Sequence, residues 1–310
     1  MKKVFIDGSA GTTGLRIKER LSLRNDIELI TLSEEMRKDP EARKEALNSC
    51  DIAFLCLPDA AAIEAVSMIE NENVVVLDTS TAHRTNDGWA YGFPELSKEH
   101  FEKVKNSKRI AVPGCHASGF IALTYPLVEK GIIDKDTLLT CHSITGYSGG
   151  GKKMIAEYED SEREFLFDAP RQYALGQTHK HMPEICKVTG LSNIPVFCPI
   201  VSDFYSGMVV TVPIFKSQLN DGFTAEDIKK AYKEKYTGEI VTYLESIDES
   251  GLISANALRL KDSMQVTVSG NDDRILLIAR YDNLGKGASG AALECMNIVM
   301  GNSPSEMLDI

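Results

Sequence analysis

The stretch KVFIDGSAGTTGLRIKERL, residues 3–21, decides the fold of this chain. Its first five residues are a short apolar run, typical of a buried strand. Leu15, Ile17 and Leu21 then recur at helical spacing within the segment 15–24. Between strand and helix lies a turn with glycines at 8, 11 and 14. Such a turn lets the backbone approach a phosphate, and the helix N-terminus offers free N–H groups to it. The stretch therefore predicts the start of a dinucleotide-binding domain.

The residues of this turn are the first candidate cofactor contacts. They are Gly8, Gly11, Thr12, Thr13 and Gly14, in a G-x-x-G-x-x-G spacing that differs from the usual G-x-G-x-x-G. A purely structural turn in an α/β protein is the alternative. Its position between the first strand and the first helix favours the cofactor interpretation.

The end of the second expected strand, residues 27–32, bears on the choice of cofactor. An Asp or Glu at that point would hold a ribose 2′-hydroxyl, but Leu32 and Ser33 occupy it, with Arg37 and Lys38 just beyond. A hydroxyl and two cations suit a 2′-phosphate, which favours NADP(H) over NAD. Glu34 and Glu35 argue the other way, and the two cations could simply form a solvated face.

The rest of the chain divides into two patterns. In the first half, apolar runs at 51–57 and 73–77 alternate with a helical segment at 40–47, which predicts βαβ units and a doubly wound, Rossmann-like parallel sheet. After about residue 136 the pattern changes to longer strands and polar loops. The expected strands are 137–145, 196–200, 208–215, 263–269 and 274–280, and the expected helices are 152–163 and 225–232. We predict a mixed α+β second domain there.

Composition narrows the class of partners and the location. The 310 residues carry 34 Lys+Arg against 45 Asp+Glu, a formal net charge of -11, which disfavours nucleic acid and anionic membranes. There is no apolar run of the ~20 residues that span a bilayer, and the N-terminal residues lack a secretory apolar core. Seven scattered cysteines without a Cys-x-x-Cys pair suit reduced thiols. We expect a cytoplasmic protein.

Cys115 is the candidate nucleophile. It follows the turn at Pro113-Gly114 and opens an apolar stretch, 117–125, that predicts a helix. A thiolate at a helix N-terminus is stabilised by the dipole and the free N–H groups, which also suit an oxyanion. A buried, inert cysteine at a strand-to-helix turn is the alternative.

Two histidines, His179 and His181, stand in one polar segment that we expect to be a loop or short strand. On an extended chain both side chains would face the same side. The pair lacks the spacing of a zinc site, so we expect no metal. His116 is adjacent to the cysteine, but neighbouring residues on a helix point ~100° apart.

Seven segments in order resemble the N-acetyl-gamma-glutamyl-phosphate reductase family, the acyl-phosphate reductases of arginine biosynthesis, in the shorter of its two sequence types. The segments are GSAGTTG at 8–14, DTSTAHR at 78–84, YGFPEL at 91–96, PGCHASG at 113–119, TGYSGGGKK at 145–153, HKHMPEI at 179–185 and DNLGKGASGAALECMN at 282–297. The resemblance covers nearly the whole chain. The longer type has an aromatic residue and proline after the cysteine, where His116 and Ala117 stand here.

The resemblance implies a division of labour along the chain. Residues 1–115 with 285–310 would bind NADP(H), and residues 116–284 would form the catalytic, substrate-binding and oligomerisation domain of a homodimer or homotetramer. Cys115 would be the nucleophile and His179 the base, with His181 and His116 as lesser candidates. An acyl phosphate would be attacked to give a thioester, which hydride reduces to the aldehyde.

Further contacts are expected from the remaining motif residues. The anionic substrate needs local cations, for which Arg84 and Lys152 are candidates, with His181 beside them; a surface ion pair is the alternative for each cation. Asn283 is a candidate to hold the nicotinamide carboxamide, and Gly287 to let the backbone pass close to the cofactor.

Three rival functions stay open. Aspartate-semialdehyde dehydrogenase and a reductase for the one-carbon-longer aminoadipyl substrate share the domain plan and the cysteine chemistry. Because one methylene is worth only ~1–3 kcal/mol, the sequence does not decide chain length. The third alternative is a catalytically inactive NADP-binding sensor.

Overall fold

The structure is a computed structural model that describes residues 1–310, and its chain divides into two units. The first unit comprises residues 1–94, 98–113 and 291–306, and the second comprises 95–97, 114–290 and 307–310. Each unit has its own sheet.

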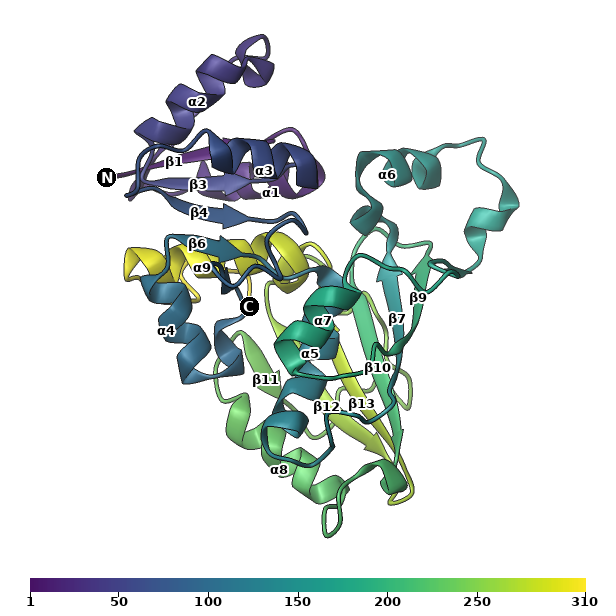
Figure 1. Ribbon diagram of the computed structural model, residues 1–310. Helices are drawn as coiled ribbons and strands as arrows, with labels where there is room; N and C mark the ends of the chain where they lie inside the picture. Colours follow the sequence, from purple (N-terminus) through teal and green to yellow (C-terminus); the bar gives the residue numbers. More distant parts are fainter. The chain divides into compact units, whose positions relative to one another are not determined.

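The sheet of the first unit is parallel throughout, with strand order β2-β1-β3-β4-β6-β5 (Figure 1). The strands are β1 (Lys2–Asp7), β2 (Ile27–Ile30), β3 (Ile52–Leu55), β4 (Val75–Asp78), β5 (Ala90–Tyr91) and β6 (Arg109–Ala111). All residues of β3 and β4 are buried, as expected for central strands that helices cover on both faces. The order reverses at β1, which confirms the predicted doubly wound arrangement.

Four helices connect these strands along the chain: α1 (Thr12–Leu21), α2 (Pro40–Ser49), α3 (Asp59–Ser67) and α4 (Lys98–Asn106). A fifth, α9 (Gly290–Met300), comes from the far end of the chain. Helix α1 begins at Thr12, three residues before the first apolar residue of its predicted stripe, because the turn leads directly into the helix. Arg24 of this unit donates to Asn297 of α9 at 2.5 Å, which ties the C-terminal helix to the first βα unit.

The sheet of the second unit is mixed, with strand order β11-β12-β13-β10-β7-β9-β8. The strands are β7 (Thr140–Gly146), β8 (Arg171–Gln172), β9 (Val196–Ser202), β10 (Met208–Phe215), β11 (Val241–Tyr243), β12 (Met264–Gly270) and β13 (Arg274–Tyr281). The predicted strand at 208–215 has those bounds in the structure. The mixed α+β prediction for this part of the chain is confirmed.

Four helices belong to the second unit: α5 (Cys115–Glu129), α6 (Gly151–Glu159), α7 (Met182–Thr189) and α8 (Ala225–Lys235). Helix α5 packs on β10 and β13, with α7 and α8 against it, whereas α6 stands apart from the sheet at the end of β7 (Figure 1). A π-helical turn, Gly285–Ser289, precedes α9. None of the helices is long and apolar enough to cross a membrane.

The segment around His179 and His181 agrees with its prediction only in part. The two histidines lie in the expected loop, but His181 caps α7, which starts at Met182 within the same segment. Pro183 in the first helical turn suits this start. Backbone N–H groups in that turn have no intrahelical acceptor, so proline loses no hydrogen bond there.

Candidate active site

The glycine turn of the first unit has the geometry its sequence predicts. Gly8 has φ +86°, and a Cβ on it would lie 2.3 Å from the carbonyl oxygen of Cys56. A Cβ on Gly14 would lie 2.4 Å from the carbonyl oxygen of Gly8. Both positions therefore exclude side chains, and the backbone of the turn packs closely between β1, β3 and α1. Gly11 caps α1 without a side chain, which leaves the helix N-terminus open to an anion.

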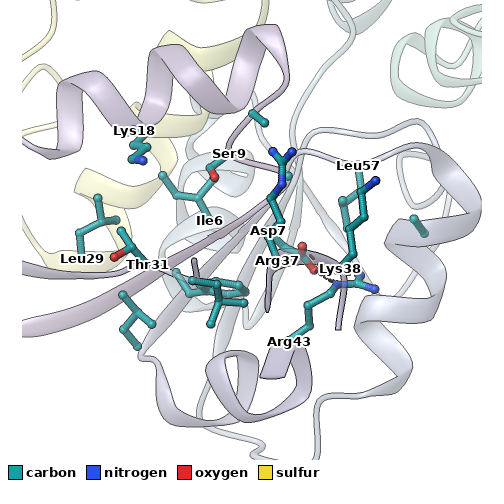
Figure 2. A pocket seen from close by; sticks show the side chains of 16 residues that line it. Ile6, Asp7, Ser9, Lys18, Leu29, Thr31, Arg37, Lys38, Arg43 and Leu57 are labelled. Carbon is teal, nitrogen blue, oxygen red and sulfur yellow. Dashed lines mark hydrogen bonds and ion pairs between the residues drawn. The ribbon is translucent and has the colours of Figure 1, made fainter. Parts of the chain in front are cut away.

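A pocket of about 400 Å³ opens at this turn (Figure 2). Its lining includes Gly8 and Ser9 from the turn, Leu29 and Thr31 from the end of β2, and four cationic side chains. The cations are Lys18, Arg37, Lys38 and Arg43. A concave, partly apolar pocket with convergent polar groups is the usual form of a cofactor site.

Two buried polar atoms beside the turn have no hydrogen-bond partner within the protein. They are Thr12 Oγ1, in the first turn of α1, and Arg37 Nε. Because buried polar groups are almost always hydrogen-bonded, such atoms suit a ligand that supplies acceptors. A dinucleotide pyrophosphate at Thr12 and a phosphate at Arg37 would do so, and the residues present thus fit NADP(H).

The carboxylate in the pocket is already paired. Asp7, at the end of β1, accepts hydrogen bonds from Arg43 at 3.0 and 3.1 Å (Figure 2), and Arg43 also donates to Glu64 at 3.2 Å. Burial raises the pKa of Asp7, against the opposing effect of Arg43. Arg43 is therefore engaged in its ion pair with Asp7, whereas Arg37 and Lys38 are the cations better placed to bind a ligand phosphate. Arg37 has a single ion pair, 3.3 Å to the exposed Glu34.

Ser33 lies outside the lining of this pocket. Its hydroxyl donates to Glu35 at 3.1 Å and accepts from the backbone N–H of Met36 at 3.4 Å. These contacts stabilise the turn into the 3₁₀ segment Met36–Lys38 that carries the two cations.

In the second unit, Cys115 is the first residue of α5, and Gly114 caps the helix without a side chain. Three neighbours fix this helix start. The buried carboxylate of Glu184, on α7, accepts from the backbone N–H of Gly114 at 3.1 Å. The hydroxyl of Tyr281 donates to the carbonyl oxygen of Cys115 at 2.5 Å. A Cβ on Gly287 would lie 3.0 Å from Cys115 Cβ, so this glycine admits the cysteine.

Three histidines gather at the N-termini of α5 and α7. The ring centroids of His116 and His179 are 5.5 Å apart, those of His116 and His181 5.7 Å, and those of His179 and His181 4.6 Å. The structure contains no group of three or more His, Cys, Asp or Glu side chains arranged to hold a metal ion. Because histidine is the side chain that most often acts as a general acid or base, the cluster offers candidates for proton transfer.

Both ring nitrogens of His116 lie within hydrogen-bond distance of a hydroxyl group. Nδ1 lies 2.6 Å from the Ser143 hydroxyl and Nε2 lies 2.6 Å from the Tyr173 hydroxyl. Burial, with a smaller effect from His179, lowers the pKa of His116 to about 3. Its ring stays neutral at neutral pH and orients Tyr173 and Ser143.

His179 is half-buried and has a defined tautomer. The backbone N–H of His181 donates to His179 Nδ1 at 3.2 Å. Because that nitrogen accepts, the neutral ring carries its proton on Nε2. The turn that caps α7 therefore positions His179 through the backbone N–H of His181, two residues along the chain.

The other expected contact residues lie in varied settings. Asn283 is buried, accepts from Gly207 N–H at 2.8 Å and donates to the Ser148 hydroxyl at 3.0 Å, so its amide is fixed within the second unit. Arg84 is buried in the first unit and donates to the carbonyls of Val112 and Thr79, each at 2.9 Å. Lys152 is exposed in the first turn of α6.

Sequence reasoning missed the supporting residues Glu184, Tyr173 and Tyr281. Glu184 stands inside the motif that contains the two histidines, five residues after His179, so the motif could have indicated it as a site residue. No motif indicates the two tyrosines, because they reach the site from β13 and from the chain after β8 through tertiary packing alone.

Comparison with known proteins identifies the domains. Residues 3–104 match the family model of the semialdehyde dehydrogenase NAD binding domain, and residues 115–283 match that of the semialdehyde dehydrogenase dimerisation domain. The N-acetyl-gamma-glutamyl-phosphate reductase of Rhizobium etli is 45% identical over 305 residues, 96% of this chain and 98% of that protein. That of Trichormus variabilis is 42% identical over 311 residues, 96% of this chain and 97% of that protein.

Solved structures share the fold at low identity. Aspartate semialdehyde dehydrogenase II of Vibrio cholerae, complexed with ASA, has a TM-score of 0.71 at 15% identity and covers 97% of this chain and 98% of its own. Aspartate semialdehyde dehydrogenase of Candida albicans, with NADP, has a TM-score of 0.68 at 17% identity. The match covers 99% of this chain and 100% of that chain. In fold, this chain resembles the semialdehyde dehydrogenases. Its sequence identity to the relatives above shows that it belongs to the N-acetyl-gamma-glutamyl-phosphate reductase family.

Proposed function

We propose that this protein reduces N-acetyl-gamma-glutamyl phosphate with NADPH to N-acetylglutamate 5-semialdehyde and phosphate, a step of arginine biosynthesis. The observation that carries the proposal is the 42–45% identity over 96% of the chain to reductases of that name. The placement of Cys115 at the open N-terminus of α5, fixed by Glu184 and Tyr281, is what the chemistry needs.

The first step belongs to Cys115. Its thiolate attacks the carbonyl carbon of the acyl phosphate, a C–S bond forms, and the C–O bond to phosphate breaks with release of inorganic phosphate. The negative charge moves from sulfur to the carbonyl oxygen in the tetrahedral intermediate. The first-turn N–H groups of α5 have no partner within the helix and stabilise this oxyanion.

The second step converts the Cys115 thioester to the aldehyde. NADPH, when bound, supplies the hydride, which reduces the thioester carbonyl to a thiohemiacetal oxyanion. His179 holds a proton on Nε2 and shares it with that oxygen. Collapse of the thiohemiacetal breaks the C–S bond, releases the aldehyde and returns the thiolate of Cys115.

Binding is divided between the two units in this proposal. Residues 1–115 with 285–310 hold the cofactor, chiefly through the turn 8–14 and Arg37, and residues 116–284 hold the substrate and the oligomer contacts. Lys152 is the exposed cation proposed for the substrate phosphate. For Arg84, the two carbonyl contacts favour a role in holding the loop after β4. We propose a cytoplasmic homodimer or homotetramer.

Reverse turnover tests the reaction and its substrate together. Purified protein is given NADP, phosphate and N-acetylglutamate semialdehyde, with aspartate semialdehyde and the aminoadipyl homologue in parallel, and NADPH absorbance is followed. We expect phosphate-dependent absorbance growth with the acetylglutamyl substrate only. Growth with aspartate semialdehyde alone would move the chain to that activity, and no growth with any substrate would favour the sensor.

Arg37→Ala is expected to weaken NADP binding by roughly 10-fold and NAD binding by less than twofold. Arg37 is the pocket cation whose Nε lacks a protein partner, and a hydrogen bond to a charged group is worth about 1.5–3 kcal/mol. Titration calorimetry with both cofactors measures the two affinities. Lys44→Ala, an exposed α2 cation paired with Glu70, is the control. Equal losses for NADP and NAD would show that Arg37 does not bind the 2′-phosphate.

A further inference from the structure

Three buried tyrosines donate hydrogen bonds to main-chain carbonyls of α5. Tyr232 donates to Leu123 and Tyr236 donates to Ala122, each at 2.5 Å. Tyr281 donates to Cys115 at the same distance. The first two hold the middle of the helix, where the Ala122 carbonyl lacks its helical donor because the residue four positions on is Pro126. The third reaches the carbonyl of the nucleophilic residue itself.

The hydroxyl of Tyr281 makes a second contact that the other two lack. It accepts a hydrogen bond from the backbone N–H of Gly119 at 3.1 Å, so one oxygen bridges residues 115 and 119, which lie one helical turn apart. A Cβ on Gly119 would lie 2.6 Å from this oxygen, which explains the glycine. Full burial raises the pKa of Tyr281 well above its usual value, so the hydroxyl keeps its proton and remains a donor.

The carbonyl of Cys115 and the N–H of His116 belong to one planar peptide group. A hydrogen bond to the carbonyl polarises that group and makes its N–H a stronger donor. This N–H belongs to the first turn of α5, among the donors that suit the oxyanion of the attacked carbonyl. We infer that Tyr281 is a positioning residue for Cys115, whose hydroxyl fixes and polarises the Cys115–His116 peptide for oxyanion stabilisation.

The expected effect of Tyr281 on turnover rests on the proposed function, because it requires the thioester chemistry. The expected effect on the reactivity of the Cys115 thiol does not require that chemistry. In the attack, charge moves from the sulfur of Cys115 to the substrate oxygen, while the Tyr281 proton stays on its own oxygen. The tyrosine therefore acts through the peptide, without touching the reacting atoms.

Tyr281→Phe tests this role, with Tyr232→Phe as the matched control. Both variants remove one buried hydroxyl that donates to a carbonyl of α5 at 2.5 Å, but only the first touches residue 115. We expect Tyr281→Phe to lower kcat about 10- to 100-fold, as small misplacements of reacting groups do, with KM within about twofold. We expect Tyr232→Phe to lower the melting temperature and leave kcat within about twofold.

A second readout is independent of the substrate. Iodoacetamide labelling of Cys115, followed by peptide mass spectrometry between pH 6 and 10, should be slower in Tyr281→Phe, with its midpoint moved to higher pH. Tyr232→Phe should label like the wild type. This arm decides the positioning role even if the wild type turns over none of the substrates, which would count against the proposed function alone.

Two outcomes would overturn the inference. One is a Tyr281→Phe variant whose kcat and labelling profile match the wild type. The other is an equal kcat loss in the two variants, which would reduce Tyr281 to a structural contact.

Discussion

Cys115→Ser is expected to abolish turnover, with a loss of about 10⁴-fold or more, while NADP binding stays within about threefold of the wild type. A serine hydroxyl at this position stays protonated, and without a thiolate no thioester forms. Reverse-direction NADPH production and calorimetric NADP titration measure the two effects. Cys198→Ser on β9 is the control, because it changes another half-buried thiol in the same unit and should leave turnover unchanged. Wild-type-like turnover in Cys115→Ser would rule out the covalent mechanism.

The rate at which Cys115 is alkylated in the wild type is an independent test of its reactivity. Burial raises the pKa of Cys50 and of Cys56 to about 12, so at neutral pH their thiolate fractions are negligible. Cys115 is half-buried at a helix N-terminus, a setting that lowers a thiol pKa. Cys115 should therefore label far faster than either. Uniformly slow labelling of all seven cysteines would favour the inactive sensor.

His179→Asn is expected to lower kcat by roughly 10²- to 10⁴-fold, the usual contribution of a general acid–base group. The amide of asparagine retains a hydrogen-bond donor but does not titrate near neutral pH, so the limb of the pH–rate profile that His179 sets should also disappear. Steady-state turnover between pH 5 and 9 measures both effects. His100→Asn on α4 is the control, since that histidine lies in the other unit.

The neighbouring histidines make this prediction specific. His116, with a pKa of about 3, is neutral throughout that pH range, so no limb of the profile belongs to it. His181 offers the test of the assignment, because its backbone N–H sets the tautomer of His179 whatever its side chain does. A larger loss in His181→Asn than in His179→Asn would show that His181 is the base.

The sequence determined the nucleotide-binding half and the place of the candidate nucleophile, for a local reason. A strand, a glycine turn and a helix in direct succession leave few conformations: Gly8 and Gly14 have no room for side chains, and α1 must start where the turn ends. The same logic holds for Cys115, because Pro113 and Gly114 break the preceding strand and the cysteine opens the next helix. Apolar runs without alternation likewise indicated strands buried on both faces.

The histidine segment shows where local reasoning was incomplete, because the two histidines lie in the expected loop but the residues after them form a helix. On an extended chain His179 and His181 would face one side, but Pro183 and the residues after it start a helix, and the two rings meet through a turn instead. The helix prevailed because residues 182–189 bury one apolar face against α5, a gain in contact that depends on a distant element.

Only the tertiary structure decided how the candidate nucleophile, Cys115, is held. Glu184 from α7 fixes Gly114, Tyr281 from β13 bridges Cys115 and Gly119, and Gly287 leaves space beside the thiol. Glu184 is 70 positions from Gly114, and Tyr281 is 166 positions from Cys115. No local sequence pattern therefore indicates either contact. Local sequence sets turns and helix starts through short-range sterics, whereas the hydrogen bonds that orient the thiol follow from how α5 packs between α7 and the sheet.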